Sequence, residues 1–188
     1  MKRLVALSII ALALAGCSAK TTLVNHPTAT VGTTATTDTT ATTDTTAATA
    51  PAVAHVGATL SLVGQSGATS SVTLVVVTDP ATPGQYVTTD PGKRFVSATF
   101  TILDTGPAIT DYADNDATLI GSDGQTYTVD VDTLAGCTNF DHGRYQLGHG
   151  ESSTGCVAFQ VPTGVTVSKV KYALDSGFSS DFGEWLVP

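Results

Sequence analysis

Apolar and polar side chains alternate along the segment from Val96 to Ile102. The apolar positions are Val96, Ala98, Phe100 and Ile102, and the positions between them are Ser97, Thr99 and Thr101. Successive side chains of a β-strand point to opposite faces, so this period of two predicts a strand with one face buried.

Seven more short runs are rich in Val, Thr and aromatic residues and are bounded by Gly, Asp or Pro. The eight expected strands are Thr59–Val63, Val72–Thr78, Phe95–Leu103, Thr118–Gly121, Thr126–Val131, Cys156–Val161, Val167–Leu174 and Glu184–Val187. No segment shows sustained helical periodicity. This spacing predicts an all-β fold, an antiparallel β-sandwich of about 7 to 9 strands spanning residues 52–188. The turn residues of Ser122–Gln125 further predict that Leu119 and Tyr127 lie on one antiparallel hairpin.

The chain opens with a bacterial lipoprotein signal. Lys2 and Arg3 precede an apolar run from Leu4 to Leu14, and Leu14-Ala15-Gly16 leads to Cys17. The run is shorter than the about 20 residues of a membrane span, which predicts a cleaved signal peptide at 1–16. By resemblance to bacterial lipoproteins, Cys17 carries lipid chains such as palmitate. These chains would anchor the protein to the outer surface of the cytoplasmic membrane, or to the outer membrane if the host has two membranes. The alternative is ordinary secretory cleavage, which leaves Cys17 a free thiol.

Lipid on Cys17 leaves an even pair of cysteines, Cys137 and Cys156. In an oxidising compartment this pair predicts a disulfide. Metal binding is the competing interpretation, but it lacks CxxC spacing or a matched His pair.

Residues 17–51 are mostly Thr and Ala and include a tandem repeat, Thr34–Thr39 followed by Thr40–Thr45. With no aromatic residue to bury, this segment predicts a disordered stalk, and its composition also suggests O-glycosylation.

The formal net charge of the chain is −8, and loss of Lys2 and Arg3 with the signal peptide brings it near −10. Nucleic acid and anionic lipid headgroups are therefore poor partners.

Four motifs resemble successive signatures of one protein family. They are Pro91–Val96, Asp123–Tyr127, Gly150–Gly155 and Val157–Gly164. The family is a domain of unknown function, common in lipoproteins of Gram-positive bacteria and related to the mycobacterial immunoprotective extracellular protein. The resemblance covers most of Gly57–Leu186 and implies an immunoglobulin-like sandwich with no established catalytic residues. His149 departs from the family pattern, which often has Pro before Gly-Glu.

The motifs themselves predict turns and strand ends. Lys93 and Arg94 are expected to be solvated at the entrance of a strand. Gly150-Glu151 is expected to lead into the strand that holds Cys156, and Pro162 is expected to end that strand.

Two polar clusters are candidate metal or catalytic sites. Asp111, Asp114, Asn115, Asp116 and Asp123 could bind calcium, but they do not match an EF-hand loop and are expected to be solvated. Asp141, His142, His149, Glu151 and Ser152 could suggest a hydrolase or a transition-metal site, but neither a GxSxG nor an HExxH motif occurs. We therefore expect no enzyme activity and no cofactor, and the weak metal candidates are Asp114, Asp116, His142 and His149.

Phe178, Phe182 and Trp185 are expected to pack the final strand against the core, and an exposed recognition patch is the alternative. Two functions stay open. The first is a lipid-tethered binding or adhesion module for an envelope or extracellular protein, which an exposed apolar patch on one sheet would favour. The second is a solute- or metal-sensing lipoprotein acting with a membrane partner, which a pocket lined by His and Asp would favour.

Overall fold

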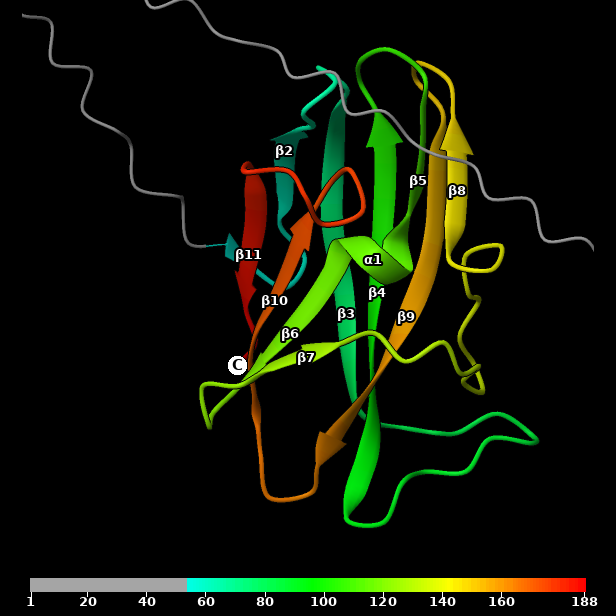
Figure 1. Ribbon diagram of the computed structural model, residues 1–188, viewed down its shortest axis with the longest axis vertical. Helices are drawn as coiled ribbons and strands as arrows, with labels where there is room; N and C mark the ends of the chain where they lie inside the picture. The colour runs from blue at the N-terminus through cyan, green and yellow to red at the C-terminus, as the bar shows by residue number, and fades with distance from the viewer. Residues whose placement is uncertain (1–53) are drawn as a thin grey trace, which may run out of the picture. The chain divides into compact units, whose positions relative to one another are not determined.

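The computed structural model describes residues 54–188 as a β-sandwich. One sheet has the order β1-β11-β10-β6-β7, the other has the order β2-β3-β4-β9, and β5 pairs with β8. The strands are β1 (Ala54–His55), β2 (Thr59–Val63), β3 (Thr69–Ala81), β4 (Lys93–Asp104), β5 (Ile109–Tyr112), β6 (Ala117–Gly121), β7 (Thr126–Thr128), β8 (Arg144–Leu147), β9 (Ser152–Pro162), β10 (Val167–Ala173) and β11 (Phe182–Leu186). Figure 1 shows the two larger sheets as layers, with β6, β10 and β11 in front of β3 and β4.

The alternation in β4 has the predicted consequence. Val96, Ala98, Phe100 and Ile102 are fully buried between the sheets. All four belong to one hydrophobic core that draws on both larger sheets. The sandwich fold is confirmed. Its two larger sheets contain nine strands, within the expected range of 7 to 9, and the separate β5–β8 pair adds two more.

Three aromatic side chains join the sheets. The ring of Phe100 lies 4.8 Å from that of Tyr172 and 6.1 Å from that of Trp185, measured between centroids. The Trp185 indole N–H donates to the Ala58 carbonyl at 2.9 Å. Burying a side chain of this size stabilises the fold by roughly 1.5–3 kcal/mol.

The hairpin of β6 and β7 is confirmed, because Leu119 and Tyr127 are register partners. Gly124 in its turn has φ +76°, a conformation that glycine adopts without strain. The expected ends of β9 are also confirmed, since the strand begins after Glu151 and ends at Pro162.

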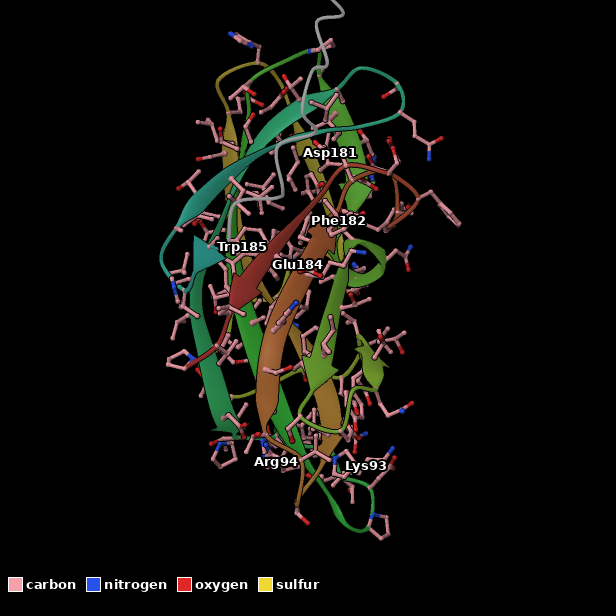
Figure 2. All side chains as sticks on the ribbon, turned by 90° about the vertical axis from the view of Figure 1, so that its left-hand side faces the viewer. Lys93, Arg94, Asp181, Phe182, Glu184 and Trp185 are labelled. Carbon is pink, nitrogen blue, oxygen red and sulfur yellow. A yellow bond between two sulfur atoms is a disulfide. The ribbon has the colours of Figure 1, made fainter. Side chains whose placement is uncertain are left out.

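The prediction that Arg94 is solvated is wrong, because its guanidinium contacts other protein groups. Its guanidinium forms a two-point contact with Asp79, at 2.5 and 2.6 Å. It also donates to the carbonyls of Pro162 and Val165 at 2.6 and 2.8 Å. Figure 2 places Lys93 and Arg94 together, at the end of the sandwich opposite Asp181. Arg94 therefore joins three chain segments, whereas Lys93 stays exposed.

The signal peptide, Cys17 and the Thr-rich stalk, with the boundaries expected at residues 16 and 51, lie outside the described residues. Within 54–188, no helix has the length and apolar character needed to cross a membrane.

Candidate functional site

The outer face of the four-stranded sheet carries two complete rows of side chains, one residue from each strand. The first row is Thr59, Thr73, Thr101 and Thr154, and the second is Ser61, Ser71, Leu103 and Ser152. These residues alternate with core positions such as Leu62, Val72 and Ile102, so they point away from the core. We call these eight residues the hydroxyl face.

Side-chain hydrogen bonds run along the first row. Thr59 and Thr73 hydroxyls lie 2.7 Å apart, and those of Thr101 and Thr154 lie 2.8 Å apart. All eight residues are exposed or half-buried, and none is charged. Val63 and Val76 extend the same face and are 46% and 44% exposed, so aliphatic groups adjoin the hydroxyls.

A second feature is a pocket of about 500 Å³ beside β8. Its lining includes Asp114, Asp130, Asn139, Phe140 and His142. Burial raises the pKa of the Asp114 carboxyl. We call this the acidic pocket, and it brings together two of the residues predicted as weak metal candidates.

Gly143 makes room for the Asp114 side chain. A Cβ at position 143 would lie 2.0 Å from the Asp114 Oδ2, and the residue has φ +75°. His142 beside it also has a positive φ, 50°, and its ring contacts Asp141 at 2.8 Å. Both side chains of this ion pair are almost fully exposed, so it adds little stability.

Asp116 is buried, which corrects the prediction that it is a solvated loop carboxylate. It ends α1 (Ala113–Asp116), a single turn before β6. Its Oδ2 accepts hydrogen bonds from the hydroxyls of Tyr172 and Tyr145, at 2.9 and 3.1 Å, and its Oδ1 accepts one from the Gly177 amide at 3.2 Å. Burial, with repulsion from Asp111, raises the pKa of Asp116 to about 8.

Asp111 is buried as well and holds the same loop. Its carboxylate accepts hydrogen bonds from the amides of Asp175 and Ser176, at 2.6 and 3.0 Å. Asp175, Ser176 and Gly177 all have positive φ values, of 59°, 55° and 81°. The buried side chains of Asp111 and Asp116 therefore stabilise three consecutive left-handed residues, an arrangement that the sequence did not reveal.

The remaining candidates lie apart from the acidic pocket. His149 Nδ1 contacts the Gly106 carbonyl at 3.2 Å, and Asp123 is exposed at the β6–β7 turn, where it accepts a hydrogen bond from Tyr127. Glu151 accepts a hydrogen bond from the Gly148 amide, and Ser152 belongs to the hydroxyl face. Within residues 54–188, no three His, Cys, Asp or Glu side chains gather as a metal site.

Cys137 and Cys156 form the predicted disulfide, with Cα atoms 6.0 Å apart. It ties the segment before β8 to the middle of β9, next to a small second core of Phe95, Leu134 and Ala158.

The three aromatic residues near the C-terminus differ in how deeply they are buried. Trp185 is buried as expected, but Phe178 is 77% exposed, and Phe182 is half-buried beneath the Lys171 ammonium, which lies 3.6 Å from its ring.

Comparison with known proteins gives a family match. The model of "Domain of unknown function (DUF4352)" matches residues 62–181. A search of curated proteins returns no match to the sequence.

Among solved structures, the secreted protein MPT63 of Mycobacterium tuberculosis is similar at 20% identity and a TM-score of 0.53, over 74% of this chain and 99% of that one. A candidate lipoprotein of Bacillus subtilis, ycdA, is 15% identical with a TM-score of 0.48, over 63% of this chain and 36% of that one. A β-sandwich protein of Clostridium difficile is 10% identical with a TM-score of 0.43, over 74% and 97%. At these identities the similarity to MPT63 supports the fold alone.

Proposed function

Because the chain belongs to the DUF4352 family, a domain family of unknown function, its role has to come from its own surface, and we propose that it is a lipid-anchored binding module of the bacterial cell envelope. The module acts without catalysing a reaction and displays its sandwich outside the cytoplasmic membrane. Its partner is another envelope component, bound through the hydroxyl face.

The location is supported by the first part of the sequence. Leu14-Ala15-Gly16-Cys17 follows a short apolar run with Lys2 and Arg3 in front of it. Lipid chains on Cys17 supply the anchor. The disulfide between Cys137 and Cys156 is consistent with an oxidising compartment outside the cytoplasm.

The observation that carries the proposal is the uncharged character of the hydroxyl face. The formal net charge of the chain is −8, yet neither row contains a charged residue. A partner that covers this face therefore does not have to desolvate a charged side chain of either row. Val63, Val76 and Leu103 add exposed aliphatic area to the same face.

The test measures binding of the full chain carrying Cys17→Ser to envelopes isolated from cells that lack the protein. Thr101 lies in the middle of the first row, so Thr101→Lys places a charge inside the face. We expect this substitution to abolish saturable binding. Tyr86→Lys is the control, because Tyr86 is 91% exposed and lies outside the face. Absence of saturable binding by the parent chain, or equal binding by the Thr101→Lys chain, would contradict the proposal.

The acidic pocket favours a second function, a solute- or metal-sensing lipoprotein that acts with a membrane partner. Asp114 and His142 both line the pocket, as this function requires. Burial disfavours the charged form of Asp114, and a bound cation would offset this cost and stabilise the folded protein. We expect millimolar calcium or micromolar zinc to raise the melting temperature of the parent chain but not of Asp114→Asn. Unchanged melting with both metals would exclude metal sensing at this pocket.

A further inference from the structure

We propose that the hydroxyl face binds a neutral, extended polysaccharide of the cell envelope. This inference rests on the binding function proposed above and names the class of partner.

The first argument is the spacing of the hydroxyl groups. Seven of the eight residues in the two rows carry a hydroxyl, Leu103 being the exception. Neighbouring strands lie about 4.8 Å apart, so hydroxyls recur at this interval across the sheet. A linear polysaccharide also presents hydroxyl groups at a regular interval, because the same set of hydroxyls recurs on each sugar ring. The two repeats allow several contacts to form in parallel.

The hydroxyls also keep free capacity for a ligand. The Thr59–Thr73 and Thr101–Thr154 pairs each use one O–H donor, at 2.7 and 2.8 Å. Each pair therefore retains one donor and several lone pairs, because a hydroxyl offers one donor and two acceptor positions. Sugar hydroxyls have the same dual character and can satisfy both kinds of group.

Charge selects a neutral polymer. An anionic glycan or a polyphosphate would approach a molecule with a formal net charge of −8, and no Lys or Arg of the two rows would neutralise it. A cationic polymer would find acidic groups in the loops rather than on this face. The aliphatic groups of Val63, Val76 and Leu103 suit the C–H surfaces of uncharged sugar rings.

Side-chain composition disfavours a protein partner. The energetic centres of protein–protein interfaces are rich in Trp, Tyr and Arg. Neither row contains any of these residues. Many weak, repeated hydroxyl contacts are the alternative source of affinity, and a polymer with repeated hydroxyls supplies them.

The experiment uses the full chain carrying Cys17→Ser and measures co-sedimentation with insoluble cellulose, chitin and the host's cell-wall polysaccharide after removal of protein and acidic polymers. The test variant adds Thr73→Val and Thr101→Val, which remove two neighbouring central hydroxyls and keep β-branched residues in the strands. The control adds Thr118→Val and Thr128→Val, a register pair on β6 and β7. Melting temperatures verify that each variant is folded.

We expect saturable binding to at least one of these polysaccharides, about tenfold weaker in the Thr73/Thr101 variant and unchanged in the control. Absence of binding to all three, or equal binding by the test variant, would overturn the inference. A third outcome is saturable binding to untreated envelopes that the Thr73/Thr101 variant weakens, with no binding to the purified polysaccharide. This outcome would support the proposed binding function and refute the glycan as its partner. Self-association that the Thr73/Thr101 variant abolishes, seen by sedimentation in the absence of glycan, would identify a second copy as the partner and also reject the glycan.

Discussion

The protonation of Asp116 is coupled to the fold. Its carboxyl group contacts the hydroxyls of Tyr145 and Tyr172 and the Gly177 amide, with the buried Asp111 nearby. Its pKa is raised from an ordinary value of 3.8 to about 8, chiefly because burial disfavours the charged form. The folded protein therefore holds a proton here at neutral pH.

This shift predicts how stability depends on pH. A carboxyl group whose folded pKa lies above its unfolded pKa contributes stability that is fully present below pH 3.8 and is lost as pH rises toward 8. We expect Asp116→Asn, which imitates the neutral form, to remove up to about 1.4 kcal/mol per pH unit from this slope. Urea unfolding between pH 5 and pH 8 measures it. Asp141→Asn, at a side chain that is 86% exposed, is the control, and an unchanged slope in Asp116→Asn would refute the assignment.

Gly143 is a second residue with a direct energetic consequence. A Cβ there would collide with the Asp114 carboxylate and would also sit on a left-handed residue. We expect Gly143→Ala to lower the free energy of unfolding by about 2–4 kcal/mol. Gly150→Ala is the matched control, since Gly150 has φ +81° with no atom near its Cβ position, and about 1–2 kcal/mol is expected. Equal losses in chemical denaturation would show that the Asp114 contact adds nothing.

At the scale of elements, the disulfide connects the segment before β8 to β9. The two cysteines are 19 residues apart, and closing a loop of this length stabilises a fold by about 3 kcal/mol in the chain-entropy model. Replacing both cysteines with Ala should lower the melting temperature by several degrees under oxidising conditions. With excess reductant, the parent and the variant should melt together. If the oxidised parent protein melted less than one degree above the reduced parent protein, the disulfide would not have this role.

The long strands were predictable because their alternation spans many residues, as in β4. The short strands β5 and β8 were missed, since four residues carry little periodicity and β5 buries the charged Asp111. The Thr and Ser residues of the hydroxyl face were visible at alternate positions, but only the strand register aligns them into rows. Arg94 and Asp116 were expected in solvent because their partners are distant in sequence, at Asp79 and Tyr172 respectively.

At the scale of the whole molecule, the family inferred from four motifs is confirmed by the match over residues 62–181. The lipid anchor remains a prediction. Cys17→Ser should release the protein into the soluble fraction of host cells with an unchanged melting temperature, because Cys17 precedes the sandwich at residues 54–188. Fractionation and thermal denaturation measure the two properties. A Cys17→Ser protein that stays with the membrane would disprove the anchor.

The first strand of the sandwich has a mechanical consequence. β1 pairs in parallel with β11 through only two register positions, Ala54 with Trp185 and His55 with Leu186. Tension pulling on the chain ahead of Ala54 reaches the domain at this short ladder. The ladder should give way at low force, while the longer pairing of β3 with β4 stays intact. In the proposed lipid-anchored protein, release of β1 would lengthen the tether at the cost of one small core residue, Ala54, before the pairing of β3 with β4 is strained.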